Sequence, residues 1–144
     1  MVPSVPADAV RALARASRIL ERASGELNLS QYRVLASVAA GDERATRIAD
    51  RLALGKPAIT AAVESLRQRG LLTRSGVASD QRAAALALTA EGRATLDTVE
   101  RAMRERLGEL AARTPDPDAF VQALVWLDAA IDAFLGHTAP GGRP

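Results

Sequence analysis

The spacing of apolar residues follows a helical period along nearly the whole chain and changes to an alternating period only once. Before residue 70, apolar residues recur at steps of three and four, as on one face of an amphipathic helix. Residues 82–89 instead alternate, with Ala84, Leu86 and Leu88 on one face, as in a half-buried strand. The helical period then returns. The pattern predicts a mainly α-helical fold with one small β-hairpin.

Capping and turn residues set the predicted boundaries. Ser30 is expected to cap the second helix, with Leu29 and Val34 as a hydrophobic staple. Thr89 is expected to cap the fifth helix, and Asp116 the sixth. The predicted helices span residues 8–24, 30–40, 45–52, 56–69, 90–113 and 117–135, and the predicted strands span 71–74 and 82–89.

The composition excludes several kinds of chemistry. The 144 residues suit a single domain, and they include no cysteine, so disulfides, thiolate metal sites and thiol redox switches are excluded. The one histidine, His137, falls in a Pro/Gly-rich tail, which leaves little for a zinc site or for acid–base catalysis. The chain has no apolar run of membrane-spanning length and no secretory signal. We therefore expect a cytoplasmic protein without a membrane partner, metal or other cofactor.

Charge is divided along the chain. Residues 44–82 carry eight basic and three acidic groups, whereas residues 97–134 carry four arginines and eight acids. A basic middle segment suggests a surface for a polyanion, although charges on exposed helices would give the same pattern.

The order of predicted elements in residues 44–89 is a short helix, a turn, a second helix and a two-stranded hairpin. This order defines a winged helix–turn–helix, which suits duplex DNA. A helix fits the major groove, where the base edges differ in their donors and acceptors. An arginine at a hairpin tip suits the adjacent minor groove.

Three segments resemble the MarR-type winged-helix transcriptional regulators. They are LNLSQYRVLASVA (27–39), TRIADRLALGKPAITAAVESLRQRGLLTR (46–74) and SDQRAAALALTAEGR (79–93). In the last segment, Asp80 and Arg82 precede an alternating strand that ends in Leu88, Thr89 and Gly92, as in the wing of that family.

The resemblance implies a homodimer that binds a pseudo-palindromic operator on double-stranded DNA, often as a repressor released by a small aromatic or anionic effector. It implies dimerisation helices at 8–29 and 97–135 around a DNA-binding lobe at 30–96, and we expect 136–144 to be a disordered tail. Effectors of the family commonly bind between the dimerisation helices and this lobe.

The resemblance also assigns roles to single residues. Arg82 is expected to contact the minor groove, and Asp80 either orients it or pairs with Arg74. Arg47 is a candidate for phosphate contact. The sequence departs from the family at Gly55, where a capping Ser or Thr is common, and at Ala61, which can reach only a thymine methyl. The positions expected to face the major groove are Lys56, Pro57, Thr60, Ala61 and Glu64.

Two other functions are compatible with parts of the sequence to different degrees. A winged helix can serve as a protein-interaction module without DNA binding, which the modest net charge of +2 and the short Ala61 side chain would allow. An enzyme is disfavoured, because the sequence has no nucleotide-binding glycine loop, metalloprotease motif or nucleophile–histidine pair. We expect Tyr32 and Trp126 to serve in packing and Asp128 and Asp132 to lie on a solvated helix face rather than to bind a metal.

Overall fold

The computed structural model describes residues 1–42, 44–75 and 85–137, and within them the chain forms six helices and one pair of strands. This confirms the predicted order of elements and the mainly helical class. The elements are α1 (Ala7–Ala23), α2 (Leu29–Ala39), α3 (Ala45–Leu52), α4 (Lys56–Gln68), β1 (Leu72–Ser75), β2 (Ala85–Leu88), α5 (Ala90–Ala111) and α6 (Pro117–Phe134).

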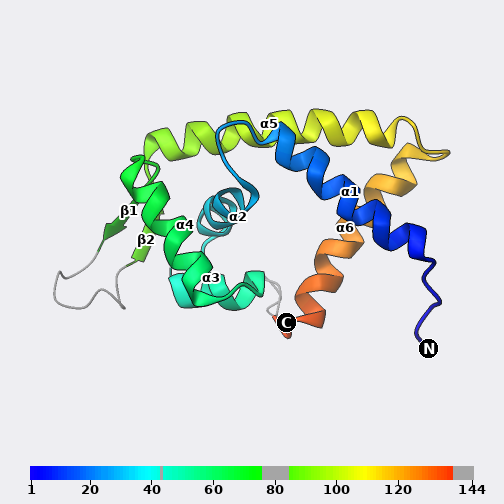
Figure 1. Ribbon diagram of the computed structural model, residues 1–144, viewed down its shortest axis with the longest axis horizontal. Helices are drawn as coiled ribbons and strands as arrows, with labels where there is room; N and C mark the ends of the chain where they lie inside the picture. The colour runs from blue at the N-terminus through cyan, green and yellow to red at the C-terminus, as the bar shows by residue number, and fades with distance from the viewer. Residues whose placement is uncertain (43, 76–84, 138–144) are drawn as a thin grey trace, which may run out of the picture.

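Helix α5 is the long element that the other parts of the molecule share (Figure 1). The helices α2, α3 and α4 and the two strands form a lobe beneath one end of α5. Helices α1 and α6 lie beneath its other end, and α6 runs back toward α3. The lobe is therefore connected to α1 and α6 mainly through α5.

The hydrophobic core lies in the lobe and on the adjoining face of α5. Full burial of each valine, leucine, isoleucine or methionine side chain in this core contributes about 1.5–3 kcal/mol to stability. Helices α1 and α6 contribute no buried residue to the core. The core residues are Leu27, Val34, Leu35, Val38, Ile48, Ala49, Ile59, Ala62, Val63, Leu66, Leu71, Leu72, Leu86, Leu96, Val99 and Met103.

The start of α5 is fastened to the end of α4 and the start of β1. The Thr89 hydroxyl accepts a hydrogen bond from the Gly92 N–H at 3.0 Å and donates one to the Gly70 carbonyl at 2.6 Å. This confirms Thr89 as the cap. A Cβ atom on Gly92 would lie 2.0 Å from the Leu71 carbonyl oxygen, so only glycine fits there. The wing strands and α5 thus share one rigid junction.

The predicted cap of α2 was wrong: the cap is Asn28, not Ser30. The Asn28 side chain accepts from the Gln31 N–H at 2.8 Å, and the Gln31 side chain accepts from the Asn28 N–H at 3.0 Å. This reciprocal capping box satisfies two helix-end donors, whereas Ser30 alone would satisfy one. Because a staple begins with the residue before the cap, the expected staple from Leu29 to Val34 does not apply either.

Helix α6 ends in a structured turn. Gly136 has a positive φ of 75°, and the His137 N–H donates to the Asp132 carbonyl at 2.8 Å. We expected the tail to begin at residue 136, but these two residues close the helix instead. Residues 138–144 lie outside the described residues.

Candidate nucleic-acid interface

Helices α3 and α4 form a helix–turn–helix with one face in the core. Ala53 closes α3 in the left-handed conformation, with φ 52°, and Gly55 leads into α4. Pro57 occupies the first turn of α4, where a backbone N–H is not needed for helix bonding. Ile59, Val63 and their neighbours face the core, so the opposite side of α4 faces outward.

The outward side of α4 carries all five residues that were predicted to face the major groove. They are Lys56, Pro57, Thr60, Ala61 and Glu64, and all are exposed. A threonine hydroxyl can donate or accept at a base edge, and a carboxylate can accept from a cytosine amino group. Glu64 is paired with Arg67 on the same helix at 3.2 Å, so base contact by Glu64 would compete with this surface ion pair.

The arginines around α4 differ in their availability. Arg47 on α3 is 74% exposed, and only its Nε is engaged, 3.3 Å from Asp42. Arg69 instead bonds the carboxylate and the carbonyl of Glu26, each at 3.1 Å, which ties the end of α4 to the loop before α2. Arg74 is half-buried on β1. Of these three, Arg47 is the best placed for a phosphate.

The expected wing contacts cannot be placed in the structure. Asp80 and Arg82 belong to residues 76–84, which lie outside the described residues. The strands on either side pair in antiparallel fashion, with Leu72 opposite Leu88 and Ser75 opposite Ala85. The roles of Asp80 and Arg82 therefore stay predictions from the sequence.

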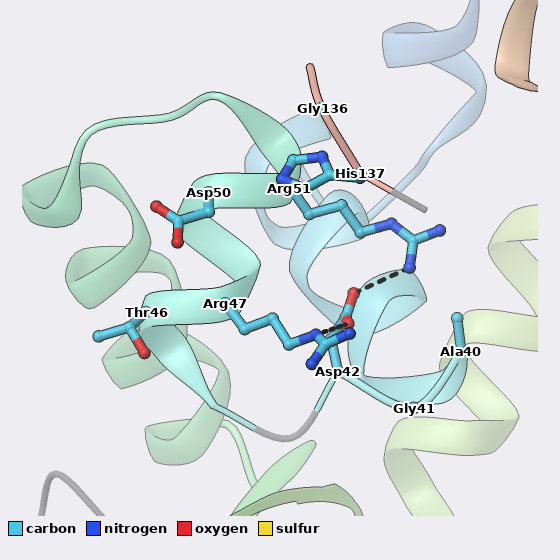
Figure 2. A pocket seen from close by; sticks show the side chains of 9 residues that line it. All are labelled: Ala40, Gly41, Asp42, Thr46, Arg47, Asp50, Arg51, Gly136 and His137. Atoms are coloured by element: carbon cyan, nitrogen blue, oxygen red, sulfur yellow. Dashed lines mark hydrogen bonds and ion pairs between the residues drawn. The ribbon is translucent and has the colours of Figure 1, made fainter. Parts of the chain in front are cut away.

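A buried acid lies beside the helix–turn–helix, and the sequence analysis did not single it out. The Asp42 carboxylate is bound by Arg47 and by Arg51, at 3.3 and 3.4 Å (Figure 2). Asp42 is only 4% exposed, although it sits in a turn beside Gly41. A pocket of about 460 Å³ opens beside it, between the start of α3 and His137.

Asp132 on α6 belongs to the same cluster of charged side chains. The expectation that Asp132 lies on a solvated helix face was therefore wrong. Its carboxylate lies 3.6 Å from the second terminal nitrogen of Arg51, and its side chain is 17% exposed. Asp128, one turn earlier, is exposed as expected. Arg51 thus joins α6 to the lobe.

A second pocket, of about 430 Å³, lies between α1, α2 and α5. Leu20, Leu29, Met103 and Leu107 provide apolar walls, and Arg33 and Arg104 also line it.

Tyr32 lies in the wall of this second pocket, and its hydroxyl donates to Glu100 at 3.1 Å. Burial, the negative charge of Glu100 and this hydrogen bond raise the pKa of Tyr32 to about 12. The phenol therefore stays neutral and remains a donor at any physiological pH.

Comparisons with known proteins agree with this geometry. Residues 26–83 match the model of the MarR family. A transcriptional repressor, CouR, bound to a 23-mer DNA duplex is 27% identical, with a TM-score of 0.72 over 85% of this chain and 89% of that chain. No curated protein matches the sequence significantly.

Two further structures share the fold at lower identity. Wild-type MarR from E. coli in its apo form is 19% identical, with a TM-score of 0.69 over 85% of this chain and 96% of that one. CouR from Rhodococcus jostii RHA1 bound to p-coumaroyl-CoA is 22% identical, with a TM-score of 0.69 over 94% of this chain and 92% of that one.

The helix–turn–helix, the strand pair and the outward face of α4 define a winged helix–turn–helix protein. Residues 26–83 match the MarR family model, and the fold of MarR-family transcription regulators is shared over 85% of the chain, so the winged helix–turn–helix of this protein is of the MarR type. Members of this family are transcription regulators rather than enzymes, so the alternative that this protein is an enzyme is rejected. Among the described residues, no helix is both long and apolar enough to cross a membrane.

Proposed function

We propose that this protein is a homodimeric, sequence-specific DNA-binding repressor that a small organic effector releases from its operator. The outward face of α4 carries the proposal, because it presents Lys56, Thr60 and Ala61 to solvent on a braced helix. In a symmetric dimer, two such helices would enter successive major grooves about 10 base pairs apart. Arg82 would add a minor-groove contact, and Arg47 a phosphate contact.

The apolar surfaces of α1 and α6 support the dimer. Val125, Trp126 and Phe134 on α6 are 59, 66 and 90% exposed, and Val10 and Leu13 on α1 are 63 and 57% exposed. Apolar patches of this kind on a soluble protein mark contact surfaces. We propose that a second copy of the chain covers them.

The charges of the two helices are complementary. Helix α1 carries four arginines and two acids, whereas α6 carries three acids and no basic residue. Opposite charges around an apolar interface fix the orientation of the partners and favour the correct encounter. This pattern supports packing of α1 of one protomer against α6 of the other.

The pocket beside Tyr32 is the proposed effector site. Its volume of about 430 Å³ falls in the usual range for small-molecule sites. Apolar walls together with Arg33 and Arg104 suit a molecule with an apolar, often aromatic, body and an anionic group. Because the pocket is lined by lobe helix α2 and by α1 and α5, an occupant would contact both parts of the molecule.

Selection of duplexes from a random pool, followed by titration at several salt concentrations, tests DNA binding. Affinity should fall steeply with salt, and Arg47→Ala should lower the slope by about 0.9 through loss of one phosphate-neutralising charge. Arg82→Ala should weaken binding through loss of the minor-groove contact. Arg101→Ala is the control, because Arg101 is an exposed arginine on α5 outside the predicted interface. If no duplex binds even at low salt, the protein-interaction alternative replaces this proposal.

Thermal-shift titration with aromatic carboxylates tests the effector site. Arg104→Ala should weaken the stabilisation by such ligands, whereas Arg101→Ala, one turn away and outside the pocket, should not. Equal responses of the two variants would refute the assignment of this pocket.

A further inference from the structure

Arg51 holds two carboxylates that belong to different parts of the molecule. One terminal nitrogen lies 3.4 Å from the Asp42 carboxylate, and the other lies 3.6 Å from the Asp132 carboxylate. The Arg51 side chain is 27% exposed, and the carboxylates it bridges are 5 and 17% exposed. Partial exclusion of water makes these charge interactions stronger and less sensitive to salt than those of exposed pairs.

The two carboxylates sit at positions that matter for the arrangement of the lobe. Asp42 precedes α3. Arg51 lies in the last turn of α3, four residues before Gly55, the N-cap of α4. Asp132 lies near the end of α6, whose apolar face we assign to the dimer interface. Among the described residues, the Arg51–Asp132 pair is the one ion pair between α6 and the lobe.

The lobe is also attached elsewhere, through its junction with α5. That attachment includes the core residues Leu96, Val99 and Met103 of α5, the Thr89 and Gly92 contacts and the Tyr32–Glu100 hydrogen bond. Figure 1 shows the end of α6 approaching α3, well away from the α5 junction. A lobe packed mainly along one helix can still tilt relative to the other end of that helix, whereas a second fastening at a distance restricts the tilt.

We infer that Arg51 and Asp132 fix the angle between the lobe and the dimer helices and so determine the half-site spacing that the protein accepts. The inference rests on the proposed DNA-binding dimer. Neither residue is expected to touch a base. They act as positioning residues by setting the distance between the two copies of α4, and the His137 N–H bond to the Asp132 carbonyl closes the end of α6 next to this pair.

The first test compares the DNA sites that variants select from a pool with random half-site separation. The wild-type protein should select one separation. Asp132→Asn should select the same half-site sequence at two or more separations. Asp128→Asn is the matched control, because it also removes one acid of α6 from the dimer charge pattern but has no contact with Arg51, and it should keep a single separation. A single unchanged separation for Asp132→Asn overturns the inference.

The second test needs no DNA. Since the chain has no cysteine, Gln68→Cys on the exposed side of α4 places one spin label on each protomer. The label-to-label distance distribution in the dimer, measured by pulsed electron paramagnetic resonance, should be narrow in the parent and in the Asp128→Asn variant. It should broaden or shift in the Asp132→Asn variant, while the melting temperature and the dimer mass stay near those of the parent.

The two arms separate the possible failures. An unchanged distance distribution in Asp132→Asn overturns the inference whatever the DNA result. A changed distribution together with no DNA binding by the wild-type protein supports the fastening of the lobe and overturns the proposed function instead.

Discussion

Tyr32 shows how the fold changes the chemistry of a single side chain. Burial is the largest cause of its raised pKa, followed by the charge of Glu100 and by the hydrogen bond to it. The neutral phenol is favoured in the folded state. The stability that this gives is therefore fully present below pH 10 and is lost as the pH rises toward about 12.

The chain has one tyrosine, so its ionisation can be followed directly by ultraviolet absorbance. We expect a midpoint near 12 in the folded protein and near 10 in denaturant. Glu100→Gln should lower the folded midpoint without bringing it to 10, because burial remains. A folded midpoint at 10 in the parent would contradict the buried Tyr32–Glu100 contact.

Among the described glycines, Gly92 is the one where an added Cβ atom should reduce stability most. Gly92→Ala would drive a Cβ into the Leu71 carbonyl and should lower the free energy of unfolding by about 1–3 kcal/mol. Gly108→Ala on the same helix meets nothing within 4 Å and should raise it by about 0.5–1 kcal/mol. Urea denaturation of both variants measures the difference, and equal effects would refute the close approach.

At the level of whole elements, the start of α2 depends on its cap Asn28, which lies two residues before the predicted cap Ser30. Asn28→Ala removes one half of the capping box and should reduce the free energy of unfolding by about 1 kcal/mol. Ser30→Ala should change it little, because Ser30 lies in the first turn of α2 rather than at its cap. Thermal or urea denaturation distinguishes them, and the reverse order would restore the cap at Ser30.

The elements were predictable because their determinants are local. Periodicity gave the helices, and Thr89 and Asp116 were identified as caps from the residue types that satisfy helix-end donors. The signal for Asn28 was also present, since Gln31 stands three residues later as a capping box requires.

The Arg51 cluster was not predictable in the same way. Asp42 and Asp132 are far apart in the sequence and meet the same guanidinium only in the folded molecule. Nothing local distinguishes Asp132 from Asp128, although the structure partly buries Asp132 and exposes Asp128. Similarly, the outward face of α4 followed from its period, whereas the pocket beside Tyr32 needed three helices to be placed in space.

For the whole molecule, the main expectation is that the exposed faces of α1 and α6 are covered by a second copy. Trp126 is the only tryptophan and is 66% exposed in the single protomer. The fluorescence emission of Trp126 should therefore move to longer wavelength as dilution dissociates the dimer and exposes the indole ring to water. Sedimentation across the same concentrations provides the control. A monomer at micromolar concentration, with emission independent of dilution, would contradict the dimer.

The segregation of charge between α1 and α6 has a consequence for how ionic strength acts on such a regulator. Added electrolyte screens the attraction between protomers as well as displacing protein from phosphates. Below the concentration at which protomers associate, occupancy of an operator should fall more steeply with electrolyte than it does when every protomer is already paired. A dilute population of protomers should thus respond more sharply to ionic strength than a concentrated one.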